Sequence, residues 1–558
     1  MIKTFIFKRF GLLFGIFSLV GLPAAFSQEG ELSEEQILIQ KDKKIVLPEV
    51  AKPQEKVLVT LKPLPKVKQK YSYREFPLAL PLLDPKLKAP IPKTDKMSEI
   101  RQGFVRIGVG NYGSTLLDAI YNSGRQRDYA FGAYINHQAS ASGPVDNSGY
   151  SRNEAGAYGK YFTPNFTLSG GLDYSRRRYN FYGYDQERFK DRKSDSTRQV
   201  FQSILFNLDL EKNKKGKPLQ YGLGLSVGNI SDRFQASESE IIIRFSGNYR
   251  LKDSSSFRLF SDISLAKRAD SSSQNRSLWR IQPQYHFAWK GFMVEAGFQA
   301  SVDNEPELKD AVYKDKTRFH FHPQLLLQQA VFQQKLLAFA GIGGGMVKRN
   351  LRSFLEVNPY LAPNVYLRHE NQLLNFFVGV KGQFQGQWQY RSQLSFETLA
   401  NQAFYLNDTT NREKFQLVYD DNNTRRFTFE TEVTYDVTES SRAGVRAAFM
   451  SYGVKSLSEP WHAPHSLITL FGRQSISDNF LLSGEFYYMG GLKSLNPESL
   501  ETETLTGMAD LNLKGEYFFK KRFSGYVSAH NILNNKNQRF LYYPTQGFRL
   551  MVGATASF

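Results

Sequence analysis

The sequence predicts an all-β fold, an antiparallel transmembrane β-barrel of about 22 strands, with about 20 as the alternative count. Apolar and polar residues alternate in short segments from residue 101 onward, as they do in strands with one buried face. Beyond the N-terminus the chain holds no run of about 18 apolar residues, so helices would not carry it across a membrane. Short and long connections alternate between the segments, which is typical of transmembrane barrels.

Residues 1–27 have the features of a secretory signal peptide. Three basic residues precede an apolar run that begins at Phe10, and the small residues of "AFS" come directly before Gln28. A membrane anchor is the alternative, but the uninterrupted run is shorter than the roughly 20 residues that a spanning helix needs. We therefore expect cleavage after Ser27.

Residues 28–100 form a separate region rich in proline and lysine, as in "LPEVAKPQEKVLVTLKPLPKVKQK". The prolines are spaced so that neither a helix nor a central strand persists. We expect a largely disordered, extended periplasmic tether. It is either a spacer, a docking arm for a periplasmic or outer-membrane protein, or a segment that folds back into the barrel.

Residues 101–558 carry the strands of the predicted barrel. The segments "LQYGLGLSVG" (219–228), "FLLSGEFYY" (480–488) and "ADLNLKGEY" (509–517) each place apolar residues on one face and polar or small residues on the other. Polar residues at every second position of 509–517, three of the four charged, suit a face that lines a wet interior. Transmembrane barrels show this pattern, with apolar side chains outward and polar ones inward.

The connections alternate in length along this region. Short turns are expected at "TPN", "NKKGKP", "QQK" and "KKR", and long loops at "DQERFKDRKSDS", "NEPELKDAVYKDK" and, the longest, "LRSFLEVNPYLAPNVYLRHEN". The hairpin around "GNYGST" and the segment "FQLVYDDNNTRRFTFETEVTYD" leave the strand count open. An even count places both ends of the barrel in the periplasm, with the tether.

The chain ends on the strand "GFRLMVGATASF", residues 547–558. Its alternation predicts that Val552 and Ala554 face lipid, and that Arg549, Met551 and Thr555 face a polar lumen. The terminal strand with Phe558 resembles the C-terminal signature by which the outer-membrane assembly machinery recognises its clients. That machinery is an expected partner, together with outer-membrane lipid and lipopolysaccharide.

The end of the chain, "NILNNKNQRFLYYPTQGFRLMVGATASF", resembles the end of TonB-dependent receptor barrels. The segments "GNYG", "GLDYSRRRYNFYGYD" and "EPWHAP" are similar to a branch of those receptors in Bacteroidota that lacks the plug domain. The chain departs from the main family because residues 28–100 include nine prolines and are too few for a plug of roughly a hundred residues. The resemblance implies transport across the outer membrane, gated by a partner or by the barrel's own loops.

Candidate chemical sites are few. His320 and His322 in "RFHFHP" are expected to share the lumen face. They form either part of a metal site or two ordinary polar residues of the lumen. His462 and His465 lie in a surface loop, and "GIGGGM" (341–346) lacks the lysine and helix of a phosphate loop. The cluster Asp420–Asn423 is either a calcium site or a turn. No catalytic, cofactor-binding or metal-binding residue is assigned, no cofactor is expected, and the chain is not expected to be an enzyme.

The composition narrows the function further. The chain has no cysteine, which excludes disulfides and thiolate chemistry. A net charge of +19 comes without a clustered basic module, so nucleic acid is not an expected partner. Basic runs such as 176–178 have three alternative interpretations. They face lipopolysaccharide phosphates, they line an anion-selective lumen, or they form an ordinary solvated surface. Two function classes remain: a transport barrel, or a structural or assembly component of an outer-membrane complex.

Overall fold

The computed structural model describes residues 101–212, 217–309, 312–332, 335–384, 386–420, 422–438 and 440–558. These residues all belong to one of the two compact units into which the chain separates. The signal peptide expected at 1–27 and the tether expected at 28–100 lie outside the described residues. Among the described residues, no helix is long and apolar enough to cross a membrane.

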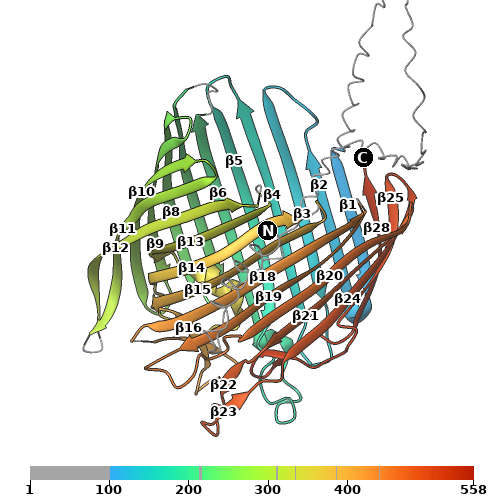
Figure 1. Cartoon of the computed structure of the whole chain (residues 1–558). Coiled ribbons are helices and arrows are strands. Elements are labelled where there is room, and N and C mark those ends of the chain that lie inside the picture. The colour runs from blue at the N-terminus through green and yellow to red at the C-terminus, as the bar shows by residue number, and fades with distance from the viewer. Residues whose placement is uncertain are drawn as a thin grey trace, which may run out of the picture. The chain divides into compact units, whose positions relative to one another are not determined.

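The unit is a closed antiparallel barrel of 22 strands, as predicted (Figure 1). Each strand pairs with the next barrel strand along the chain, and the first pairs with the last. The barrel strands are β1 (Gly103–Gly110), β2 (Ser114–Asn122), β3 (Tyr129–Ser140), β4 (Tyr150–Phe162), β5 (Thr167–Asn180), β6 (Arg198–Lys212), β7 (Leu219–Asp232), β8 (Ser237–Lys252), β9 (Ser255–Ala269), β10 (Ser273–Trp289), β11 (Phe292–Lys309), β12 (Val312–Val331), β13 (Leu336–Val347), β14 (Glu370–Phe384), β15 (Trp388–Ala400), β18 (Thr424–Thr438), β19 (Ser441–Gly453), β20 (Ser466–Ser477), β21 (Phe480–Gly490), β24 (Met508–Lys520), β25 (Phe523–His530) and β28 (Arg549–Ser557).

The closing pair is β1 with β28, where Val109 lies opposite Val552 and Ile107 opposite Ala554. Closure leaves neither strand with a free edge, so the backbone groups of both are paired on each side. Phe558 extends this ladder, because its backbone exchanges hydrogen bonds with Gly103 at 2.8 and 2.9 Å.

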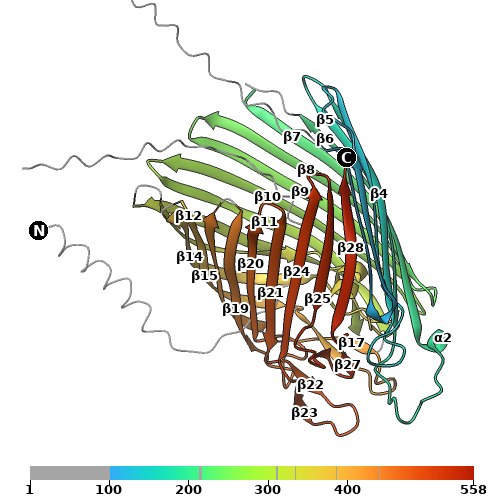
Figure 2. The same cartoon turned by 90° about the vertical axis from the view of Figure 1, so that its right-hand side faces the viewer.

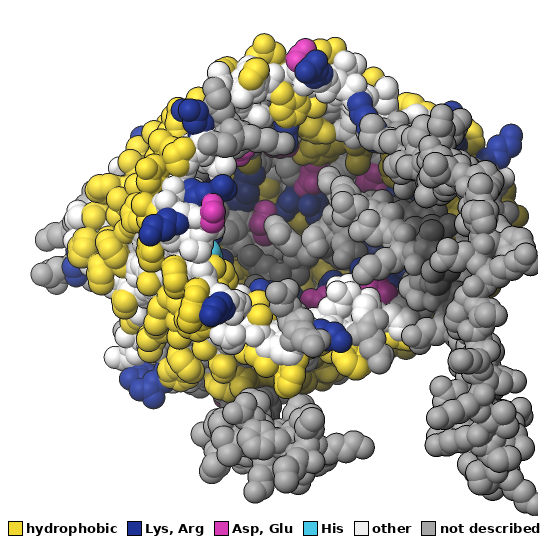
Figure 3. Space-filling view, turned by 45° about the horizontal axis from the view of Figure 1, so that its top comes forward, with side chains coloured by type: hydrophobic (Ala, Val, Ile, Leu, Met, Phe, Trp, Pro, Cys, Tyr) yellow, Lys and Arg dark blue, Asp and Glu magenta, His cyan; other side chains and the backbone are white. Residues whose placement is uncertain are grey.

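Apolar side chains cover the outside of the barrel and charged ones line its interior (Figure 3). On β28 the side chain of Val552 is 52% exposed and points outward, whereas Met551 is only 5% exposed. Arg549 points inward and donates to the hydroxyl of Tyr150 at 2.6 Å. The expected faces of this strand are confirmed, except that Met551 is buried inside the wall, with its sulfur 4.0 Å from the hydroxyl of Tyr526, and so does not face an open lumen.

Long connections gather at one end of the barrel, the loop end, and short turns gather at the other, the turn end (Figures 1 and 2). The C-terminus lies at the turn end. The loop end carries three small sheets and three short helices. They are β16 (Ala403–Asn407) with β17 (Phe415–Tyr419), β22 (Lys493–Leu495) with β23 (Thr502–Thr504), β26 (Gln538–Phe540) with β27 (Tyr543–Pro544), η1 (Asn111–Gly113), α2 (Ser194–Thr197) and α3 (Leu351–Val357).

Two expectations about the connections are wrong. "NEPELKDAVYKDK" is not a loop, because β11 and β12 continue through it and pair as far as Lys309 opposite Val312. Within it, Glu305 forms an ion pair with Arg318 across the hairpin at 2.7 Å, as does Asp303 directly before the segment. The connection 348–369 is also slightly shorter than 401–423, which holds β16 and β17.

The two ambiguous segments are resolved. "GNYGST" is the tight β1–β2 connection, where Tyr112 takes a positive φ of 56°. "FQLVYDDNNTRRFTFETEVTYD" contributes first a strand of the small β16–β17 sheet and then the barrel strand β18.

Candidate functional site

Three long connections meet above the interior of the barrel in one apolar cluster, which we call the mouth core. Connections 348–369, 401–423 and 531–548 supply most of it, and the loop-end residues of β6 and β7 supply the rest. These elements come from well-separated places in the strand order, so the connections reach across the opening. The buried members are Phe201, Ile230, Leu351, Phe354, Leu355, Leu361, Ala362, Val365, Leu367, Tyr405, Phe415, Leu417, Phe540 and Tyr543.

Aromatic side chains hold the mouth core together. The rings of Tyr360 and Tyr543 stack with centroids 3.6 Å apart, and the ring of Tyr182 meets Tyr543 edge-on at 4.8 Å. Tyr182 also donates its hydroxyl to the carbonyl of Pro544 at 2.9 Å. Burial raises the pKa of Tyr182 to about 12, so this phenol stays a neutral donor. The connection 181–197 is thereby joined to 531–548.

The short helix α3 places the 348–369 connection against the inner wall. Asn350 and Ser353 form a reciprocal capping box at its start. Leu351, Phe354 and Leu355 then lie on one face at helical spacing and enter the mouth core. The backbone N–H of Leu351 donates to the carboxylate of Glu238 at 2.8 Å, which places a negative charge at the positive end of the helix.

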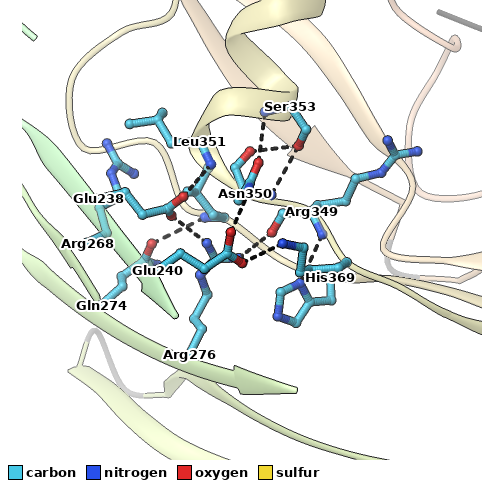
Figure 4. Close-up of polar contacts among 12 residues, drawn as sticks. Glu238, Glu240, Arg268, Gln274, Arg276, Arg349, Asn350, Leu351, Ser353 and His369 are labelled. Carbon is cyan, nitrogen blue, oxygen red and sulfur yellow. Dashed lines mark hydrogen bonds and ion pairs between the residues drawn. The ribbon is translucent and has the colours of Figure 1, made fainter. Parts of the chain in front are cut away.

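Five inward side chains of β8, β9 and β10 bind this connection (Figure 4). We call them the wall latch: Glu238, Glu240, Arg268, Gln274 and Arg276. Four of them bind backbone groups of the connection. Glu238 accepts the N–H of Leu351, Arg276 donates to the carbonyl of Arg349 at 2.8 Å, Arg268 donates to the carbonyl of Val365, and Gln274 accepts the N–H of Leu367 at 3.4 Å. Glu240 accepts hydrogen bonds from Lys348 at 2.7 Å and Asn350 at 3.0 Å.

At the centre of the wall latch, Glu238 and Arg276 form an ion pair at 2.6 Å with side chains 2% and 1% exposed. Two charges removed from water in this way are stable only while they satisfy each other, so removing one partner leaves an uncompensated buried charge. The arrangement therefore fixes the position of the 348–369 connection more strictly than apolar packing alone would.

His320 and His322 share the inner face of β12, as predicted, and their rings stack with centroids 6.2 Å apart. His320 binds the carboxylate of Asp303 at 2.6 Å, and His322 binds the amide oxygen of Asn371 at 2.8 Å. Among the described residues, no group of three or more potential ligands is placed to hold a metal ion. The geometry fits two polar residues of the inner wall.

His462 is buried, which corrects the expectation of an ordinary surface-loop residue. Its Nδ1 binds the carbonyl of Tyr405 at 2.8 Å, and its Nε2 accepts the backbone N–H of Leu541 at 3.2 Å. The ring therefore ties 454–465 to 401–423 and 531–548. Burial lowers its pKa to about 4, so the ring is neutral and can accept that N–H. His465 binds the carbonyl of Met450 at 3.1 Å.

Asp420 also joins two connections. Its carboxylate accepts the backbone N–H of Lys455 at 3.0 Å and both the N–H and hydroxyl of Ser456, at 2.8 and 2.5 Å. Burial opposes ionisation, but the hydrogen bonds from Ser456 and the neighbouring amides prevail and lower the pKa of this carboxyl. The geometry fits a turn and not a calcium site, although Asp421 itself lies outside the described residues. The segment 341–346 lies within β13 and is a strand, not a phosphate loop.

Neither a protein-family model nor a curated protein matches the sequence. The FrpB iron transporter of Neisseria meningitidis has the same fold, with a TM-score of 0.65 at 10% identity over 83% of this chain and 82% of that chain. The ferric-catecholate import receptor Fiu of E. coli K12 gives 0.63 at 8% over 83% and 82%, and the copper transporter OprC gives 0.63 at 9% over 82% and 80%. The fold is that of a TonB-dependent receptor barrel.

Sequence reasoning missed the residues of the wall latch and of the mouth core at the loop end of the barrel. The signal was present in "SESE" (237–240) and "KRAD" (267–270), where charges occupy inward positions at the loop ends of two strands. Charges at such positions need partners, and the partners here are backbone groups of a distant connection. The sequence pattern of β8 or β9 does not show which connection supplies these partners.

Proposed function

We propose that this chain is an outer-membrane transport barrel whose extracellular mouth is held shut by its own loops. The observation that carries the proposal is the mouth core together with the wall latch, because a purely structural barrel has no need for buried ion pairs that hold one connection across its opening. The loop end is then extracellular and the turn end periplasmic. The apolar outer surface supports this location, since a closed barrel is the only sheet whose backbone is fully paired in hydrocarbon.

In this proposal the 348–369 connection is the gate. The loops close the barrel, as a separate plug does in TonB-dependent receptors. Opening of the barrel breaks the hydrogen bonds of the wall latch. The segment 1–27 directs export, and the segment 28–100 is a periplasmic contact for a gating partner. The likeness in fold to receptors and transporters of iron and copper compounds supports transport as a class.

Conductance of the purified protein in planar bilayers tests the proposal. We expect the mature chain to be closed, and a variant with 351–367 replaced by a flexible Gly-Ser linker to form an open pore. Replacing 496–501, the tip of the β22–β23 hairpin, is the matched control and should leave the barrel closed. A further variant combines the 351–367 replacement with removal of residues 28–90, so that most of the tether is absent from the measurement.

If that combined variant folds, as judged by heat-modifiable migration on gels, and still conducts no ions, the transport proposal fails. The alternative, a structural or assembly component of an outer-membrane complex, would then be favoured.

A further inference from the structure

The outer face of β5 changes from apolar to basic close to the loop end. Leu172 and Tyr174 are outward apolar residues, and the next two positions on the same face are Arg176 and Arg178. Residues two apart on a strand share a face, so both guanidinium groups continue the outward line directly beyond the apolar surface. Arg177, between them, points inward and pairs with Glu154 at 3.0 Å.

On β3 and β4, polar outward side chains mark the same level, whereas on β2 the polar outward residue lies one step nearer the loop end. Thr115 of β2 binds His137 of β3 at 2.9 Å, and His137 binds Asn153 of β4 at 2.7 Å. Asn153 lies opposite Arg176 in the ladder. One step toward the turn end, the outward residue of β3 is Ile135, which is exposed and apolar. The boundary between apolar and polar outer surface therefore passes between Tyr174 and Arg176.

The arginines at this boundary are grouped with like charges and are short of acidic partners. Arg176 and Arg178 are two residues apart on the same face of β5, and Arg198 lies on the paired strand β6 opposite Asn180, so three like charges are grouped here. Within the described part of the chain, no carboxylate forms an ion pair with Arg176 or Arg178, and Nε of Arg178 is buried without a hydrogen-bond partner. Arg198 pairs with the exposed Asp195 at 2.8 Å and with no other carboxylate of the described residues. Inward arginines such as Arg177, Arg244 and Arg280 all pair with acids.

We propose that Arg176, Arg178 and Arg198 form a binding site on the outer wall for the phosphate groups of an anionic glycolipid in the surrounding leaflet. The proposal rests on the membrane location proposed above and not on transport. Guanidinium groups bind phosphate through paired N–H donors, and such charge-assisted bonds are strong beside an apolar surface. Tyr174 and Ile204, outward and exposed next to the cluster, would contact the acyl chains. A bound phosphate also removes the repulsion between the three cations.

The test uses the mature full-length protein and lipid A as the probe, with native mass spectrometry to measure the lipid retained after purification. The double variant Arg176→Gln/Arg178→Gln should retain lipid A with an affinity at least about tenfold lower than the wild type, because two charge-assisted contacts are lost. Lys267→Gln is the matched control, since Lys267 is a single outward cation at the loop end of β9, and it should retain lipid A as the wild type does.

Loss of folding does not explain the expected result, because removing two of three repelling cations should leave stability in lipid-free detergent unchanged or raised. Equal lipid A retention by the wild type and the double variant would overturn the site, and so would an equal loss in Lys267→Gln. Insertion into phosphatidylcholine vesicles with and without lipid A is measured in parallel. Failure of the wild type to insert into either would overturn the membrane location itself, whereas insertion into both with unchanged retention would overturn only the lipid site.

Discussion

At the scale of single residues, the position of the 348–369 connection depends most on the Glu238–Arg276 pair. Both side chains are buried, and each also binds the backbone of the 348–369 connection. Arg276→Met leaves the carboxylate of Glu238 without its partner, so we expect the free energy of unfolding to fall by about 3 to 5 kcal/mol. Urea midpoints of the barrel in lipid vesicles measure the loss.

The exposed pair Arg446–Glu432, at 3.1 Å, provides the control for this prediction. Arg446→Met should cost no more than about 1 kcal/mol, because solvent already screens that pair. Replacing both latch partners, as Glu238→Gln with Arg276→Met, should recover part of the loss, since no charge is then left buried. Equal losses in the two single variants would contradict a buried latch.

His462 makes the mouth core sensitive to acid. In the unfolded chain its pKa is about 6.5, and in the folded protein burial lowers the pKa to about 4. Protonation therefore favours the unfolded chain, and the stability that neutral His462 contributes is complete above about pH 6.5 and is lost as the pH falls toward 4. The difference corresponds to about 3 kcal/mol.

Unfolding measured between pH 7 and pH 4 tests this, with His462→Gln as the comparison. The variant should be less stable at pH 7, because it loses the hydrogen bonds to Tyr405 and Leu541, but its stability should fall less steeply with acid. All other titrating groups are common to both proteins, so the difference in slope reports His462. Parallel curves would mean that this ring is not held neutral by burial.

At the scale of elements, the strands were predictable from the sequence because the face that a residue occupies depends only on its position in the strand. The segment 304–316 marks the limit of that reasoning. Its charges favour a solvated loop, and only the partner strand shows that Arg318 compensates Asp303 and Glu305 inside the barrel. The inward pair His320 and His322 was predictable for the same reason as the strands, but the hydrogen-bond partners of these rings were not.

The mouth core could not be predicted from the sequence, for a different reason. Leu367, Phe415 and Tyr543 belong to three connections that meet only after 22 strands have closed. Each connection is rich enough in polar and turn-forming residues to look like an ordinary surface loop, as 454–465 did around His462. Their apolar residues have no regular spacing, because they pack against other loops and not against a sheet or a helix.

At the scale of the whole molecule, the inner face of the barrel wall is polar and its outer face is apolar. Arginine and acid side chains pair across neighbouring strands on the inside, as Arg280 does with Asp262 and Arg426 with Glu397. Outside, leucine, isoleucine and aromatic side chains stay exposed. In water, so much exposed apolar surface is unfavourable, so this distribution is stable only if hydrocarbon covers the outer face.

Arginine substitutions at two depths on the closing strand, β28, test whether hydrocarbon covers the outer face. Val552 lies near the middle of β28 on its outward face, and Ala556 lies on the same face at the turn end. An arginine at Val552 should cost about 2 to 4 kcal/mol and an arginine at Ala556 about 0 to 1, because the penalty for a basic group on the lipid face falls from the bilayer midplane to its surface. Urea midpoints in lipid vesicles of Val552→Arg and Ala556→Arg measure the two costs, and Val552→Leu controls for changes in side-chain volume. Since both arginines occupy one face of one strand, differences in strand pairing or register do not enter the comparison. Equal penalties at the two positions would mean that the wall has no depth-dependent apolar surroundings, and β28 would then not span a bilayer.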